Sequence, residues 1–124
     1  MAFAGQIAAN TDLVLYSGND DVILPMMSLG GKGVISVIAN ILPKETHEVC
    51  QKYLDGDFEG ALADYLKMNE LIHALFVEVN PIPVKEAMNI LGFGVGECRM
   101  PLCSMEEKNI EVLKTAMKNY GLKF

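Results

Sequence analysis

The sequence predicts an α/β fold that is not complete within these 124 residues. Two short and almost wholly apolar segments, residues 12–17 and 34–37, have the composition of buried parallel strands. Helical patterns fill the rest of the chain. A buried parallel strand needs a neighbour on each side, so two such strands cannot form a closed sheet. We therefore expect the end of a larger α/β protein, with two strands followed by helices.

The composition argues against a disordered protein and against a nucleic-acid-binding protein. Hydrophobic residues make up 51% of the chain and charged residues 21%, which excludes a disordered protein. Ten basic residues stand against sixteen acidic ones, for a net charge of -6, and no Lys or Arg run occurs. Such a chain repels phosphate backbones, so we expect no nucleic-acid partner.

Cysteine usage and hydropathy predict a cytoplasmic protein. Three cysteines without a close pairing pattern do not make a disulfide framework, and we expect reduced thiols. No secretory signal is visible at the N-terminus. Residues 22–42 approach the length of a membrane-spanning helix, but Pro25, Gly30, Gly31 and Gly33 interrupt them, so no membrane association is expected.

Turn and capping residues place the predicted elements in order. Residues 3–9 have the pattern of a helix end, and the strand at 12–17 closes with a polar turn. Asn19, Asp20 and Asp21 are N-cap candidates for a helix over 21–29, which Gly30 and Gly31 end. The strand at 34–37 follows.

Four helices are predicted after the second strand. The first begins at Pro43 and runs over 44–54, and the second has a broad apolar stripe over 58–77. The third opens in the run Asn80-Pro81-Ile82-Pro83 and ends at Gly92. The last opens in a capping box formed by Ser104 and Glu107 and ends near Gly121.

Several motifs are better explained by structure than by chemistry. The run Gly30-Gly31-Lys32-Gly33 lacks the spacing of a phosphate loop and fits a tight turn. Glu70 and His73 form one half of a di-iron pattern that needs a second copy, so an ordinary surface or subunit-contact histidine is favoured. Asp20 and Asp21 are possible acid/base carboxylates, although turn and N-cap roles explain them more simply. No metal and no cofactor are expected.

The segments after the two predicted strands are the best candidates for a functional site. Parallel α/β sheets carry their chemistry at the carboxyl edge of the strands. Residues 17–20 and 34–40 occupy that edge, and Gly18 lets the backbone approach a ligand closely.

Three ordered motifs resemble the dihydrodipicolinate synthase family, from about residue 6 to the C-terminus. They are Tyr16-Ser17-Gly18-Asn19-Asp20, Leu29-Gly30-Gly31-Lys32-Gly33-Val34-Ile35-Ser36-Val37 and Phe76-Val77-Glu78-x-Asn80-Pro81-Ile82-Pro83-Val84-Lys85. The segment Arg99-Met100-Pro101-Leu102 is also similar to that family. The related sialic acid lyases usually differ in the first two motifs.

The resemblance implies the C-terminal part of a (β/α)₈ TIM barrel followed by a helical region. On this interpretation residues 1–42 are the end of the barrel, with its seventh and eighth strands. Residues 43–124 are the last barrel helix and the C-terminal helical region. A whole barrel needs about 250 residues, so the remaining strands lie outside this chain.

The resemblance also implies a lyase that condenses pyruvate with aspartate semialdehyde in lysine and diaminopimelate biosynthesis, in a homotetramer. The family's Schiff-base lysine has no match here, so this chain holds no catalytic residue. Gly18 and Ile35 match substrate-binding positions, Ile35 through its backbone carbonyl, which leaves its side chain to pack elsewhere. Asn19 and Asp20 match the pocket rim, and Asn19 departs from the commoner Asp.

Two alternatives remain at this point. The first alternative to such a synthase is a non-catalytic helical piece that acts only in interaction or oligomerisation. A different pyruvate aldolase of the same family, similar to the sialic acid lyases, is the second alternative. Open strand edges also predict that the isolated chain self-associates.

Overall fold

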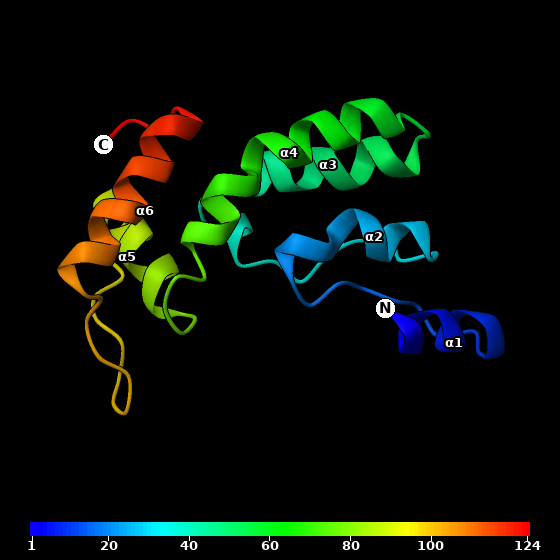
Figure 1. Cartoon of the computed structure of the whole chain (residues 1–124), viewed down its shortest axis with the longest axis horizontal. Helices are drawn as coiled ribbons and strands as arrows, with labels where there is room; N and C mark the ends of the chain where they lie inside the picture. The colour runs from blue at the N-terminus through cyan, green and yellow to red at the C-terminus, as the bar shows by residue number, and fades with distance from the viewer. The chain divides into compact units, whose positions relative to one another are not determined.

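A computed structural model describes all residues, 1–124, and it is built from helices (Figure 1). Contacts divide the chain into two compact units, Met1–Leu66 and Lys67–Phe124, which we call the first and the second unit and describe separately. No helix combines the length and the apolar character needed to cross a membrane. The predicted division between residues 42 and 43 stays a prediction. The elements in chain order are α1 (Ala2–Asn10), η1 (Asp20–Val22), α2 (Ile23–Ser28), η2 (Ile38–Asn40), α3 (Pro43–Leu54), α4 (Phe58–Ala74), α5 (Ile82–Ile90) and α6 (Glu107–Tyr120).

The predicted strands at 12–17 and 34–37 are wrong, and with them the barrel portion of the predicted fold class. The chain forms no β-strand, and the two segments meet in one isolated parallel bridge between Ser17 and Val34. A strand needs a ladder of partners, and each segment has only the other to pair with. The outer side chains are consequently exposed, with Leu13 at 67% and Ile35 at 72%, whereas strands of a parallel sheet are buried on both faces.

The predicted helix over 21–29 is present as η1 followed by α2. Its end is as predicted, because Gly30 adopts a left-handed φ of 92° that a residue with a Cβ rarely takes. Gly31 allows a close return of the backbone. Its N–H donates to the Met26 carbonyl at 3.0 Å, and a Cβ at Gly31 would lie 2.8 Å from the same oxygen.

The core of the first unit forms where α3 packs against α2 and η2. Apolar side chains from all three elements are buried there, together with Ala61 and Tyr65 of α4. Tyr65 adds a polar contact, since its hydroxyl donates to the Asp21 carbonyl at 2.5 Å. The buried apolar residues of α2, η2 and α3 are Ile23, Met27, Ile38 and Val49.

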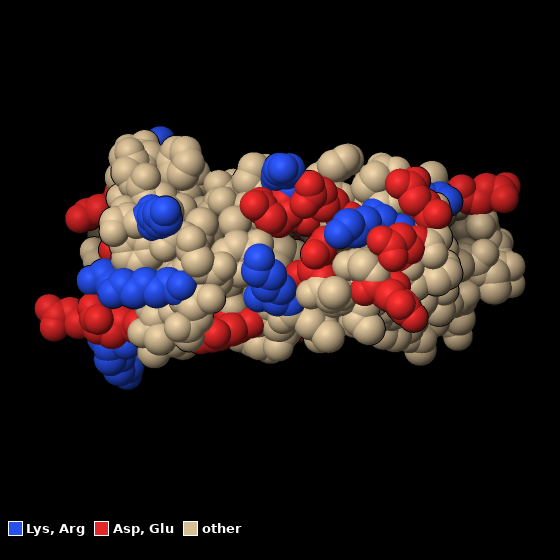
Figure 2. All heavy atoms as spheres, turned by 90° about the horizontal axis from the view of Figure 1, so that it is seen from above, with Lys and Arg blue, Asp and Glu red and all other residues tan.

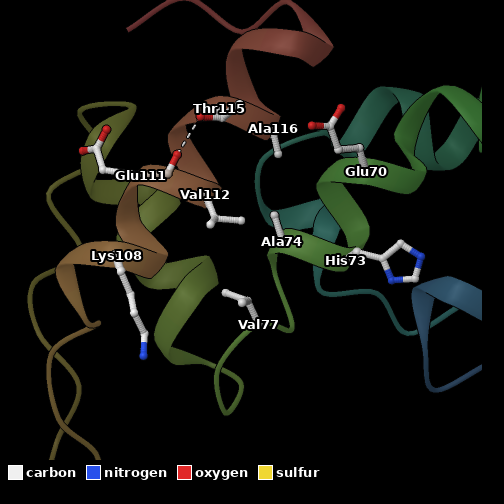
Figure 3. A pocket seen from close by; sticks show the side chains of 9 residues that line it. All are labelled: Glu70, His73, Ala74, Val77, Lys108, Glu111, Val112, Thr115 and Ala116. Atoms are coloured by element: carbon white, nitrogen blue, oxygen red, sulfur yellow. Dashed lines mark hydrogen bonds between the residues drawn. The ribbon is translucent and has the colours of Figure 1, made fainter.

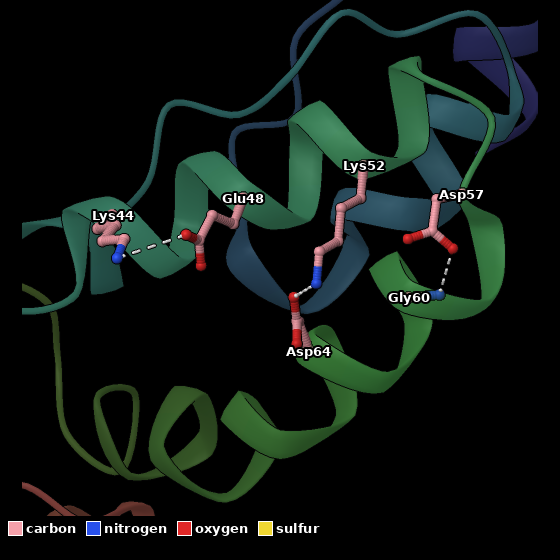
Figure 4. Close-up of polar contacts among 6 residues, drawn as sticks. All are labelled: Lys44, Glu48, Lys52, Asp57, Gly60 and Asp64. Carbon is pink, nitrogen blue, oxygen red and sulfur yellow. Dashed lines mark hydrogen bonds and ion pairs between the residues drawn. The ribbon is translucent and has the colours of Figure 1, made fainter.

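Asp57 caps the N-terminus of α4. The Asp57 carboxylate accepts a hydrogen bond from the Gly60 N–H at 2.9 Å, which satisfies one amide of the first turn (Figure 4). Lys52 of α3 and Asp64 of α4 form an ion pair at 2.6 Å. The hydrogen bond to Asp64 is the main cause that raises the pKa of Lys52, so this amine stays charged.

In the second unit α5 packs against α6, and both predicted helices are confirmed. The capping box is wrong in detail, because Glu106 rather than Ser104 occupies the N-cap and makes no side-chain cap. The Glu78 carboxylate binds the start of this helix instead. It accepts hydrogen bonds from the backbone N–H of Glu106 at 2.9 Å and from the side-chain amide of Asn109 at 2.8 Å. Gly121 ends α6 with a left-handed φ of 105°, as predicted.

Charged side chains of both signs are scattered over the surface. On the face drawn in Figure 2, Lys and Arg side chains are interspersed with Asp and Glu side chains, and no extended basic patch is visible. Pairs such as Lys114 with Glu111, at 3.0 Å, are exposed and belong to single helices. This is the pattern of solvated helix faces.

Candidate functional site

The two segments predicted to carry the site lie together in the first unit. Ser17 and Val34 form the parallel bridge, and the Ile35 N–H donates to the Ser17 carbonyl at 2.8 Å. Gly18 follows Ser17 directly, so the backbones of Gly18 and Ile35 are neighbours across the bridge. The parallel direction of the two segments agrees with the expected arrangement, although no sheet surrounds them.

Ile35 differs from its expected packing. Its side chain is 72% exposed in this chain rather than packed, because no further segment covers the bridge. Its backbone carbonyl accepts no hydrogen bond from the chain. An unpaired carbonyl in an exposed segment is available to a ligand or to another part of a larger protein.

Asp20 is a structural carboxylate, fully buried and placed between the two segments. One of its oxygens, Oδ2, accepts hydrogen bonds from the N–H groups of Val37 and Ile38, both at 3.0 Å, and the other has no partner. It therefore caps the start of η2 rather than its own helix, where the sequence placed an N-cap. Asp21 is exposed, so the two carboxylates do not form an acid/base pair.

Ser17 and Asn19 shape the turn that contains Gly18. The Ser17 hydroxyl donates to the Asn19 carbonyl at 2.6 Å and accepts from the Asn19 N–H at 3.2 Å. The Asn19 side chain is exposed and makes no hydrogen bond. Gly18 has no atom within 4 Å of the position that a Cβ would take, so the surface beside it is open.

A cavity of ≈ 310 Å³ lies in the first unit beside the same two segments but does not include Gly18 or Ile35. Burial raises the pKa of the Cys50 thiol, which leaves it a weak nucleophile. This cavity was not predicted from the sequence. The signal was the spacing of its α3 members, 43, 46, 47 and 50, which share one face of a helix. The lining residues are Tyr16, Lys32, Gly33, Val34, Ser36, Ala39, Pro43, Thr46, His47 and Cys50.

The pair Glu70 and His73 lies on a groove of the second unit, between the end of α4 and α6 (Figure 3). The groove has a volume of ≈ 610 Å³ and an apolar floor that includes Ala74 and Val112. Glu70 accepts a hydrogen bond from the Asn119 amide at 2.8 Å, and His73 is exposed. No group of three or more His, Cys, Asp or Glu side chains converges to hold a metal ion anywhere in the chain.

Most of the chain is similar to known proteins. A relative from Acetivibrio thermocellus, 4-hydroxy-tetrahydrodipicolinate synthase, is 57% identical over 111 residues, which are 90% of this chain and 38% of the relative. The crystal structure of dihydrodipicolinate synthase from Aquifex aeolicus superposes with a TM-score of 0.92 at 40% identity, over 96% of this chain and 41% of that one. The chloride-inhibited dihydrodipicolinate synthase from Acinetobacter baumannii, complexed with pyruvate, superposes with a TM-score of 0.88 at 39% identity, over 95% and 41%.

The chain therefore spans about two fifths of the length of the relatives it matches. The sequence model of the Dihydrodipicolinate synthetase family matches residues 4–120, which is nearly the whole chain. The motifs around Gly18, Ile35 and Asn80 lie within that match. The resemblance seen in the sequence is confirmed, and the chain belongs to the dihydrodipicolinate synthetase family.

Proposed function

We propose that this chain is the C-terminal part of a 4-hydroxy-tetrahydrodipicolinate synthase, a cytoplasmic lyase. The complete enzyme would condense pyruvate with aspartate semialdehyde on the route to lysine and diaminopimelate. The observation that carries the proposal is the 57% identity over 90% of the chain to a synthase of that name. The chain covers 38% of that relative, so the activity is assigned to the complete enzyme.

Within that enzyme, we assign the backbone around the Ser17–Val34 bridge to the wall of the pyruvate site. Ile35 would face pyruvate with its carbonyl, and the absence of a hydrogen bond to this oxygen within the chain supports the assignment. Gly18 would leave room for the substrate, which its open surroundings support. Asp20 would act indirectly, because its bonds to Val37 and Ile38 hold the segment that follows Ile35.

The chemistry assigned to the complete enzyme needs a lysine that this chain does not supply. A Schiff base between a lysine and pyruvate makes the ketone an electron sink, so that its methyl carbon can attack an aldehyde. This chain would line the site and exclude water. We also propose that the complete enzyme is a homo-oligomer, a tetramer as the family resemblance implies.

Two matched substitutions in the complete enzyme test the assignment. Gly18→Val places a branched side chain beside the substrate and should raise the KM for pyruvate at least tenfold; within this chain no atom lies within 4 Å of the added Cβ. Ile35→Val keeps the backbone carbonyl and should leave the KM nearly unchanged. An unchanged KM in Gly18→Val, or a large increase in Ile35→Val, would contradict the placement of pyruvate.

A further inference from the structure

Two of the three cysteines flank one turn in the loop between α5 and α6. Residues 99–102 form a four-residue turn, closed by a hydrogen bond of 3.1 Å from the Leu102 N–H to the Arg99 carbonyl. Cys98 immediately precedes this turn and Cys103 immediately follows it. Both cysteines also line the same cavity, of ≈ 200 Å³, in the second unit. The two thiols therefore lie on the two arms of a loop that turns back on itself.

Each arm is anchored close to its cysteine. On the Cys98 side, the Lys85 ammonium donates to the Glu97 carbonyl at 2.7 Å, and the Asn89 side chain makes two hydrogen bonds to the Gly96 backbone. On the Cys103 side, Met105 is buried and the next residue is held by Glu78.

The tip of the loop is exposed to solvent, whereas hydrogen bonds fix the two arms at its base. Met100 at the tip is 92% exposed. Cys103 is exposed and Cys98 is half-buried, and both thiols are free. A bond between them would close across an existing turn, so the anchored parts of the loop would not have to separate from α5 or α6.

We propose that Cys98 and Cys103 form a reversible dithiol–disulfide site that reacts with low-molecular-weight disulfides. The exposed Cys103 thiolate attacks one sulfur of the reagent, which breaks the reagent's S–S bond and releases its first thiol. The Cys98 thiolate then attacks the resulting mixed disulfide at Cys103 and releases the second thiol. Two protein thiols are oxidised to one disulfide and the reagent is reduced to two thiols.

Cys50 lies outside this site and provides an internal reference. It lies in the first unit, half-buried, and burial raises the pKa of its thiol, so little thiolate is present to react. The odd cysteine count thus divides into one proposed pair and one thiol that burial makes less reactive. The proposal is independent of the activity assigned to the complete enzyme.

Incubating the chain with oxidised glutathione and mapping its peptides without reduction tests the site. We expect an intramolecular Cys98–Cys103 disulfide with Cys50 still free, and the mixed disulfide should stay below about a tenth of the oxidised protein because the second step is intramolecular. Cys98→Ser should instead accumulate the glutathione adduct on Cys103. Cys50→Ser is the matched control and should form the bridge as the unchanged chain does.

Three results would overturn the proposal. The first is that both cysteines carry separate glutathione adducts in the unchanged chain, and the second is that Cys50 reacts before them. The third is that no thiol reacts, whereas a short unfolded peptide spanning residues 96–105 does. Restoration of both thiols by dithiothreitol completes the test, because a reversible site must return to its reduced form.

Discussion

The buried carboxylate of Asp20 accepts a hydrogen bond of 3.0 Å from the backbone N–H of Ile38, 18 residues further along the chain. The same oxygen accepts a second bond from the Val37 N–H. Asp20 therefore fastens the turn that contains Gly18 to the segment that follows Ile35. In a chain that forms no sheet, the hydrogen bonds of this side chain join two segments that a β-ladder would otherwise join.

Removing the Asp20 carboxylate should destabilise the first unit. Asp20→Ala leaves two backbone N–H groups without their acceptor, and we expect a loss of about 1–3 kcal/mol in the free energy of unfolding. Urea denaturation followed by circular dichroism measures the loss. Asp12→Ala is the control, because Asp12 is exposed and makes no side-chain hydrogen bond. Equal stability of the two variants would contradict the role given to Asp20.

Tyr65 should make stability depend on pH in the alkaline range. Burial, aided by the negative charges of Asp21 and Asp20, raises the pKa of Tyr65 above its ordinary value of 10.0. The neutral phenol is favoured in the folded state, so its contribution is complete below about pH 10 and is lost as the pH rises through the raised pKa. Denaturation midpoints of the unchanged chain should stay level between about pH 8 and 9 and fall above about pH 10.

Two phenylalanine variants isolate this effect. Tyr65→Phe should lose about 0.5–1.5 kcal/mol at neutral pH, because the bond to the Asp21 carbonyl is absent, and should show a shallower alkaline fall. Tyr16→Phe changes an exposed tyrosine and should keep the full pH dependence. An alkaline fall that survives in Tyr65→Phe would assign the effect to another group.

The cap at the start of α4 should contribute a predictable amount to the free energy of unfolding. Asp57→Ala removes the acceptor of the Gly60 N–H and should cost about 0.5–2 kcal/mol, as for other N-cap residues. Asp55→Ala, in the same connection, removes only an exposed hydrogen bond with Gln51 and should cost less. Thermal denaturation of both variants compares them directly, and a larger effect at Asp55 would refute the capping role of Asp57.

Helices could be predicted from this sequence better than strands, for a physical reason. A helix satisfies its backbone within one segment, so the signals at Pro43, Gly92 and Gly121 were enough to place three helix ends. A strand depends on partners elsewhere in the sequence, and the apolar runs 12–17 and 34–37 could not reveal that only a single bridge would form. Capping failed for the same reason, since Asp20 and Glu78 cap elements far from them in sequence.

The sequence could propose where the candidate site lies, but it could not predict the local structure there. Resemblance placed Gly18 and Ile35 in one site, and the bridge brings their backbones together. The buried role of Asp20 was hidden because its partners are backbone N–H groups, which carry no sequence signal. The exposure of Ile35 was equally hidden, since it depends on what covers the segment.

The exposed segments should make the isolated chain self-associate. Leu13 and Val14 are 67% and 64% exposed, beside backbone groups that no strand pairs. Leu13→Glu should reduce association, whereas Leu54→Glu, at an exposed apolar position on α3, should change it little. Light scattering at micromolar concentration is the measurement, and a stable monomer in the unchanged chain would contradict the expectation.

The chain alone should form no Schiff base with pyruvate. The reaction needs a neutral lysine, whose pKa is lowered by desolvation or by a neighbouring cation. The structure shows the opposite at two positions, because hydrogen bonds to Asp64 and Glu106 raise the pKa of Lys52 and Lys108 respectively. Lys32 is exposed to solvent rather than desolvated.

Reductive trapping tests this last expectation. The chain is incubated with pyruvate and borohydride and weighed by mass spectrometry, with a known Schiff-base aldolase as the positive control. We expect no stoichiometric adduct. A single lysine modified in every molecule would show that the active-site lysine lies in this chain after all. The absence of an adduct, together with condensation activity that arises only when the rest of the enzyme is supplied, would support a lysine outside the chain.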